Sequence, residues 1–248
     1  MITVKKPAAI PKKLLNEGKA ADTINRNKYD ADPNTVIKIT NKIYGHTSIK
    51  KILKRAQFDK CCFCEKSQKD ENGAVEHFRP KAGYHSDRKE KLKKPGYYWL
   101  GYEWSNLFFV CSGCNSKMHK GNLFPLEDES KRAKSHRDDI NAETPLLINP
   151  EDDPRKQIIF DKELPVGITK AGKKTIEICG LGREALNDMR KELINTLEDK
   201  IAILLAKDHH DSKKVAEARQ FIKDSQKPEA EFSATAIDYL KDLNLTGV

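Results

Sequence analysis

The sequences CCFC at residues 61–64 and CSGC at residues 111–114 decide the fold of this 248-residue chain. Each places two cysteines two residues apart, a spacing at which a tight turn directs both thiolates at one metal ion. The alternative is a set of four buried or redox-active thiols. Two pairs together supply the four soft ligands of a closed tetrahedral site. We therefore predict a structural Zn²⁺ ion bound by Cys61, Cys64, Cys111 and Cys114.

The composition is that of a basic and rather polar globular protein. The chain has 46 Lys and Arg against 37 Asp and Glu, a net charge of +9, and a mean hydropathy of −0.72. This surplus favours a polyanionic partner such as DNA or RNA, although a solvated basic surface also accounts for it. No apolar run approaches the roughly 18 residues of a membrane span, and residues 1–20 lack the apolar core of a secretory signal. We expect a cytoplasmic protein with no membrane partner, whose remaining cysteines, Cys62 and Cys179, are small buried hydrophobes.

The segment between the two cysteine pairs is too long for a simple zinc ribbon, because it contains 46 residues. Residues 74–78 are predicted to form a short strand, which ends at Arg79 and Pro80, and residues 97–110 are rich in aromatic and apolar side chains. Residues 115–120, which precede a glycine, are predicted to form a short helix. The zinc would therefore close a loop that contains a packed aromatic core.

The rest of the chain is predicted to be mainly helical. Apolar residues recur at helical spacing over residues 32–60 and at steps of three and four over residues 183–207, with further helices expected around 213–224 and 230–243. The long helix either buries its own face or binds a partner. These patterns divide the chain into four segments. They are an N-terminal basic segment with helices (1–59), a core (60–126), a charged linker (127–143) and a C-terminal helical partner-docking region (144–248).

Four polar side chains lie within or beside the loop that the zinc would close. Glu76 and His77 follow the first cysteine pair, Asn106 precedes the second pair, and Asn115 follows it. Carboxylate and amide oxygens suit a hard divalent cation such as Mg²⁺ or Mn²⁺, and a neutral imidazole can take a proton from water. Because a closed zinc site is saturated, this chemistry needs a second metal ion. The combination predicts metal-assisted phosphodiester hydrolysis, with a rate that rises with pH through an imidazole pKa of about 6.5.

This arrangement resembles the core of the HNH (ββα-metal) endonucleases over about residues 60–122. The resemblance implies that His77 is the general base, that Asn106 orients it, and that Glu76 and Asn115 bind the catalytic Mg²⁺ or Mn²⁺. It also implies an α+β fold, mainly helical, with a zinc-stapled ββα-metal core. Glu76 stands where the family more often has Asp, and Asn115 is a variant of the commoner His.

Further strings are similar to one subfamily, the HNH nuclease subunits of Septu antiphage systems (PtuB), over about residues 55–195. They are VEHFRPK at 75–81, KGNLFPL at 120–126 and LINP at 147–150, whereas GLGR at 180–183 departs from the GLNR usual in the family. The resemblance implies a role in bacterial defence with an ABC-type ATPase partner, PtuA. It extends to systems that also contain a retron reverse transcriptase with its DNA–RNA product.

Two assignments near the core keep alternatives. His119 lies four residues after Asn115 and would share its face on a helix, so it is a further candidate for the metal, a phosphate contact or a plain surface residue. The basic insert at residues 81–94 is either a solvated loop or a surface that follows a nucleic-acid backbone. The residues predicted to contact nucleic acid are Arg79, Lys81, Lys117 and Lys120.

The alternative function is a zinc-organised module that holds nucleic acid or the ATPase without cutting. Both functions need the zinc cluster and a basic surface, so neither feature discriminates between them. Substitution of His77 does, because it would abolish cleavage while leaving zinc and binding intact.

Overall fold

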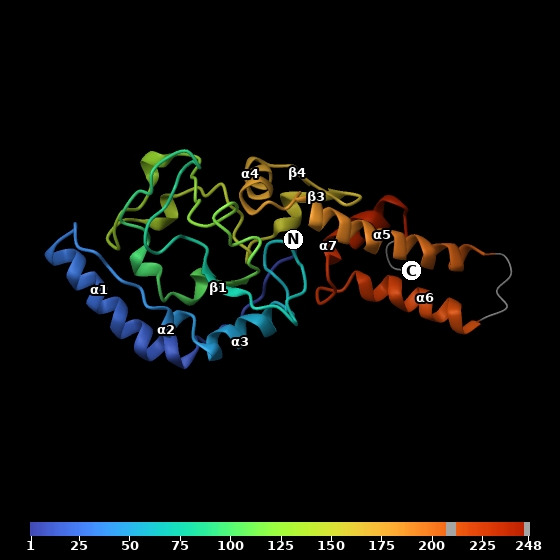
Figure 1. Cartoon of the computed structure of the whole chain (residues 1–248), viewed down its shortest axis with the longest axis horizontal. Coiled ribbons are helices and arrows are strands. Elements are labelled where there is room, and N and C mark those ends of the chain that lie inside the picture. Colours follow the sequence, from blue (N-terminus) through green and yellow to red (C-terminus); the bar gives the residue numbers. More distant parts are fainter. Residues whose placement is uncertain (207–211, 246–248) are drawn as a thin grey trace.

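The structure is a computed structural model that describes residues 1–206 and 212–245 (Figure 1). These ranges contain seven α-helices and two antiparallel two-stranded sheets, which confirms the predicted α+β class. The α-helices are α1 (Lys19–Ala31), α2 (Asn41–Tyr44), α3 (Thr47–Ala56), α4 (Lys170–Cys179), α5 (Glu184–Leu205), α6 (Ser212–Ser225) and α7 (Ser233–Asp242). The strands are β1 (Ala74–His77), β2 (Leu107–Val110), β3 (Ile158–Asp161) and β4 (Leu164–Gly167).

The sheet of β1 and β2 forms the centre of the core. The strands are antiparallel, with His77 opposite Leu107, and the strand predicted around His77 is confirmed. Successive side chains of a strand point to opposite faces. Leu107 and Phe109 accordingly pack into one apolar cluster with α3, whereas Phe108 and Val110 pack into a second cluster that contains the cysteines. The strand β2 is thus buried on both faces, as its uninterrupted apolar sequence requires.

Helices α2 and α3 cover one face of this sheet. Ile49 and Leu53, one turn apart on α3, are fully buried beneath the strands. The helix predicted from residue 32 onward begins only at Asn41, so that part of the prediction is wrong. Asp32 ends α1 with an extended backbone, since the residue before a proline, here Pro33, is disfavoured in a helix.

Residues 127–143, for which we predicted a charged linker, pack against the core through buried ionic groups. Arg132 is 5% exposed, and its guanidinium donates to the Tyr97 hydroxyl at 2.6 Å and to the Phe124 carbonyl at 2.7 Å. Glu143, which is also buried, accepts from the same Tyr97 hydroxyl at 2.7 Å. Composition alone cannot distinguish such internally paired charges from solvated ones.

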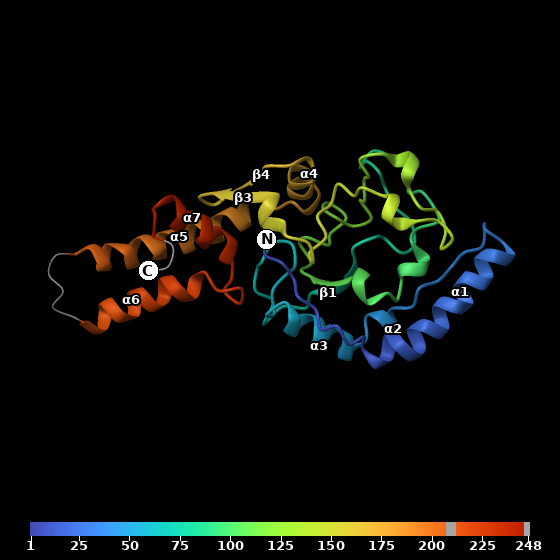
Figure 2. The ribbon, with the colours of Figure 1, turned by 180° about the vertical axis from the view of Figure 1, so that it is seen from behind.

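Helices α5 and α6 extend away from the core at the end of the molecule opposite α1 (Figures 1 and 2). Ile194 and Leu197 of α5 pack against Ile222 of α6 and Leu240 of α7 in a separate apolar cluster. The predicted long amphipathic helix and the two helices after it are confirmed; the predicted end of the first, at residue 207, lies outside the described residues. Among the described helices, none is both long and apolar enough to cross a bilayer.

Candidate metal centre and active site

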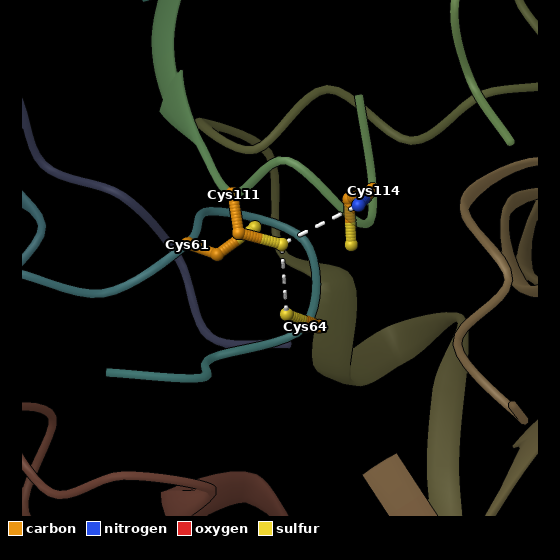
Figure 3. A group of neighbouring side chains, drawn as sticks. All are labelled: Cys61, Cys64, Cys111 and Cys114. Atoms are coloured by element: carbon orange, nitrogen blue, oxygen red, sulfur yellow. Dashed lines mark hydrogen bonds between the residues drawn. The ribbon is translucent and has the colours of Figure 1, made fainter. Parts of the chain in front are cut away.

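The four paired cysteines converge on one point in the core (Figure 3). All are buried, and their sulfur atoms lie within 4.8 Å of one another. A tetrahedral site with Zn–S bonds of about 2.3 Å needs sulfur atoms roughly 3.8 Å apart. Cys64 Sγ and Cys111 Sγ are 3.8 Å apart, and none of the six cysteines forms a disulfide. The predicted convergence is confirmed, and the cluster can hold a structural zinc ion; Cys62 and Cys179 are buried outside it, as predicted.

Backbone hydrogen bonds bring the two turns together. The Cys62 N–H donates to the Phe109 carbonyl of β2 at 3.2 Å, which ties the first turn to the strand that leads into the second. In the second turn, the Cys114 N–H lies 3.4 Å from Cys111 Sγ, and the Asn115 N–H donates to the Cys111 carbonyl at 3.1 Å. N–H groups directed at sulfur favour the thiolate that a metal requires.

Arg183, between α4 and α5, supplies positive charge next to the cluster. Its guanidinium nitrogens lie 3.6 Å from Cys114 Sγ and 4.0 Å from Cys111 Sγ, and one also donates to the Gly180 carbonyl at 2.9 Å. Gly113 leaves the space for this group, because a Cβ atom there would lie 2.9 Å from the guanidinium. Four thiolates around Zn²⁺ carry a net charge of about −2, which a neighbouring cation offsets.

We expect Arg183→Gln to lower zinc affinity by about ten- to hundredfold, the usual cost of losing a group that supports metal ligands. The measurement is competition with a chromogenic chelator. Arg219→Gln, on the exposed face of α6, is the matched control and should leave the affinity unchanged. Equal zinc affinity in both variants would contradict this role for Arg183.

His77, at the end of β1, is buried and held as a neutral imidazole. Its Nε2 lies 2.9 Å from the Gly101 carbonyl oxygen, which can only accept, so we assign the proton to Nε2. The unprotonated Nδ1 then accepts from Lys81 Nζ at 3.4 Å, and the Tyr44 ring packs edge-on at 4.5 Å. Burial, and next the Lys81 charge, lower the pKa of His77 well below its usual value. Nδ1 is therefore unprotonated at neutral pH, as a general base must be, and in this structure its lone pair faces the Lys81 ammonium.

Asn106 contacts the backbone around His77 and makes no hydrogen bond to the imidazole in the described structure. Its Oδ1 accepts from the Arg79 N–H at 2.8 Å, and its Nδ2 donates to the carbonyls of Arg79 and Leu100, each at 3.1 Å. Leu100 precedes Gly101, whose carbonyl accepts from His77. Asn106 thus affects the imidazole only indirectly, because it holds the chain segment whose Gly101 carbonyl contacts His77.

Beside β1 lies a basic hollow of about 670 Å³. Glu76 and Asn115, the two predicted oxygen ligands, both line it, together with one histidine and four cations: His85, Lys81, Arg88, Lys117 and Lys120. His85 and Arg88 belong to the basic insert at residues 81–94. We predicted this insert as a whole, and neither residue was predicted individually as part of the site. A single carboxylate among four cations makes the hollow suited to an anion that arrives with a divalent metal ion.

The short helix predicted over residues 115–120 is wrong, because the structure has consecutive turns there. Because residues 115–120 form no helix, His119 and Asn115 do not share a helix face. The His119 ring is held by the Gly113 carbonyl, 2.8 Å from Nδ1, and lies against Gly180, where an added Cβ would be 2.1 Å from Cδ2. His119 is not among the residues that line the hollow.

The four cations predicted to contact nucleic acid have different environments. Lys117 is exposed and Lys81 half-buried at the hollow. The Lys120 ammonium is instead inside the protein, 3.3 Å from Glu76 Oε1 and 2.8 Å from the His77 carbonyl oxygen. The Arg79 guanidinium pairs with Glu143 at 3.0 Å. Lys120 is buried and Arg79 is half-buried, and each is paired with a carboxylate of the protein, so both support the site from within.

No protein-family profile matches the chain. It is 38% identical over 168 residues to Septu protein PtuB of Bacillus mycoides (strain KBAB4), a match that covers 65% of this chain and 56% of that protein. It is also 27% identical over 147 residues to Septu protein PtuA of the same strain, covering 58% of this chain and 20% of that protein. The chain thus spans just over half the length of the first relative and a fifth of the second. The similarity confirms the predicted relationship to PtuB.

Proposed function

We propose that this chain, a relative of Septu protein PtuB, is a metal-dependent endonuclease that acts in bacterial antiphage defence. The observation that carries the proposal is the neutral, buried His77, whose unprotonated Nδ1 contacts a cation of the basic hollow lined by Glu76 and Asn115. A base, oxygen ligands and an anion site next to one another are the parts that phosphodiester hydrolysis requires.

In this proposal the Glu76 carboxylate and the Asn115 amide oxygen hold a Mg²⁺ or Mn²⁺ ion. When bound, the ion polarises the phosphate and stabilises the leaving oxygen. Lys120 fixes the position of Glu76, since its ammonium lies between that carboxylate and the His77 carbonyl. Asn106 holds the chain segment whose carbonyl orients the imidazole.

Lys81 links substrate binding to the base. In the described structure its ammonium donates to His77 Nδ1 and also lines the hollow. A phosphate in the hollow would compete for this ammonium, because a charge-assisted hydrogen bond to an anion is stronger than one to a neutral imidazole. Nδ1 would then be released to accept a proton from water, and attack on phosphorus would leave 5′-phosphate and 3′-hydroxyl ends.

An ABC-type ATPase, PtuA, is the proposed partner, and residues 144–248, which include helices α4 to α7, are its proposed docking region. The Septu names of both relatives support this pairing. A deletion after residue 141 cannot test it, because Ile148, Phe160 and Leu181 are buried in the main apolar cluster that also contains the cysteines. Co-purification of the full chain with PtuA is the suitable measurement. In systems that contain a retron, its reverse transcriptase and DNA–RNA product are additional proposed partners.

The direct test is incubation of the protein with DNA and with RNA, with and without Mg²⁺ or Mn²⁺, alone and with PtuA. Metal-dependent cleavage that leaves 5′-phosphates is the expected result. Tight nucleic-acid binding with no cleavage under all of these conditions would favour the alternative, a zinc-organised binding module.

The pH profile follows from the environment of His77. The unprotonated imidazole is the active form, and burial holds its pKa well below the usual value of about 6.5. The active form is therefore already fully populated at pH 6.5, so the rate should be flat from about pH 6.5 to 8 and fall only at lower pH. This prediction differs from the sequence-based expectation of a rate that rises through about pH 6.5. A rate that halves on acidification from pH 8 to 6.5 would contradict this prediction. The control is the binding constant for the nucleic acid, which should be the same at both pH values.

A further inference from the structure

A second hollow, of about 400 Å³, lies next to the basic one. Its walls come from the segment between α1 and α2 and from the far end of the basic insert. The residues that line it are residues 33–37, Lys81, Ala82, Leu92, residues 94–96 and Tyr98. The mechanism above uses only one of them, Lys81.

Lys81 is common to the two hollows. Its ammonium lies 3.4 Å from His77 Nδ1 and 4.7 Å from the centre of the Tyr44 ring, so the side chain stands at the boundary between them. Whatever occupies the second hollow is therefore one side chain away from the proposed general base.

The second hollow differs from the first in its chemistry. Val36 is 72% exposed and Leu92 40% exposed, and prolines at 33 and 95 add further apolar surface. The only charged residues that line it are Lys81 and Lys94, and no carboxylate is present in its walls. Apolar walls with cations at the edge suit a flat, uncharged group carried on a polyanion. A nucleobase on its phosphodiester chain has that character.

We propose that the second hollow receives one unpaired nucleobase beside the phosphate held in the basic hollow. This rests on the proposed nuclease function and specifies its substrate: single-stranded or locally unpaired nucleic acid. A base within a duplex must first leave its stack and its partner, which costs free energy that an unpaired base does not pay. The exposed apolar side chains Val36 and Leu92 supply the contact that recognises the base.

The test compares cleavage of a single-stranded oligonucleotide with that of the same sequence in a duplex. The wild-type protein should prefer the single strand. The double variant Val36→Ser, Leu92→Ser should lose about tenfold in kcat/KM on the single strand and little on the duplex. Both side chains are exposed, so the variant should fold. The double variant Ile159→Ser, Leu164→Ser, which removes exposed apolar side chains from the β3–β4 hairpin, is the matched control and should leave both rates unchanged.

Equal losses on both substrates, or no loss on either, would overturn the proposal, as would a wild-type protein that prefers the duplex. Absence of all cleavage would instead overturn the proposed function. In that case the affinity of the protein for a fluorescent single strand, measured by anisotropy without divalent metal, still tests whether the second hollow binds a base. Weaker binding by the Val36 and Leu92 variant than by the control supports the site, and equal binding excludes it.

Discussion

Cys114→Ser should give a protein that does not reach a stable fold and holds no zinc. Zinc binding to four-ligand sites contributes about 10–16 kcal/mol in small domains, whereas the whole free energy of unfolding of a typical domain is about 5–15 kcal/mol. The cluster joins the turn before β1 to the turn after β2, in the middle of the main apolar cluster. Loss of the metal therefore removes the connection on which the surrounding packing depends.

Bound zinc and the thermal midpoint measure this effect, and strong chelators should reproduce it in the wild-type protein. Cys62→Ala is the matched control, since Cys62 is equally buried and adjacent in sequence but lies outside the cluster. It should keep its zinc and lose only about 1 kcal/mol of stability. A Cys114→Ser protein that folds with one bound zinc would show that the four thiols are not a structural metal site.

His77→Ala and Asn115→Ala should each reduce the cleavage rate by about 10²- to 10⁴-fold, the usual contribution of a general base, with a similar loss for a metal ligand. His119→Ala should change it by less than about tenfold, because the His119 ring lies against Gly113 and Gly180 instead of lining the hollow. Product formation per bound zinc is the quantity to compare, so that any loss of folded protein is taken into account.

An inactive His119→Ala protein beside an active Asn115→Ala protein would reverse the assignment of the metal ligand. For the second oxygen ligand, Glu76→Gln is preferable to alanine. Lys120 is fully buried against this side chain, and alanine would leave its buried charge without a carboxylate counterion. The amide can still accept a hydrogen bond from the ammonium, so loss of cleavage in a protein with an unchanged thermal midpoint would report on metal binding.

The sequence alone predicted those elements that depend on the spacing of residues close together in the chain. The two-residue spacing of the cysteines indicated their common cluster, a short run that ends before a proline indicated the strand β1, and steps of three and four indicated α5. Side-chain periods of about two and 3.6 residues are properties of the chain itself, so they can be read without knowing what the element packs against. Glu76 and Asn115 line one hollow, which agrees with the expectation that joining the cysteines would bring these two residues near each other.

Tertiary structure decided the conformation between residues 114 and 121. The Lys120 N–H donates to the Cys114 carbonyl, the His119 ring bonds the Gly113 carbonyl, and the Lys120 ammonium is drawn inside by Glu76. These contacts involve partners outside any helical turn, and they override a helical tendency worth only a fraction of a kcal/mol per residue. The same reason explains why His119 lies away from the hollow.

Tertiary structure also decided which charges are solvated and which are buried. Arg79 and Lys120 look in the sequence like the other lysines and arginines of a basic protein, yet each has a carboxylate partner distant along the chain: Glu143 and Glu76. Burial of a charge is tolerated only where such a partner compensates the lost hydration. Composition determined that the protein is basic. Only the folded arrangement determines which cations remain free at the hollow, because that depends on which carboxylates the fold brings within reach.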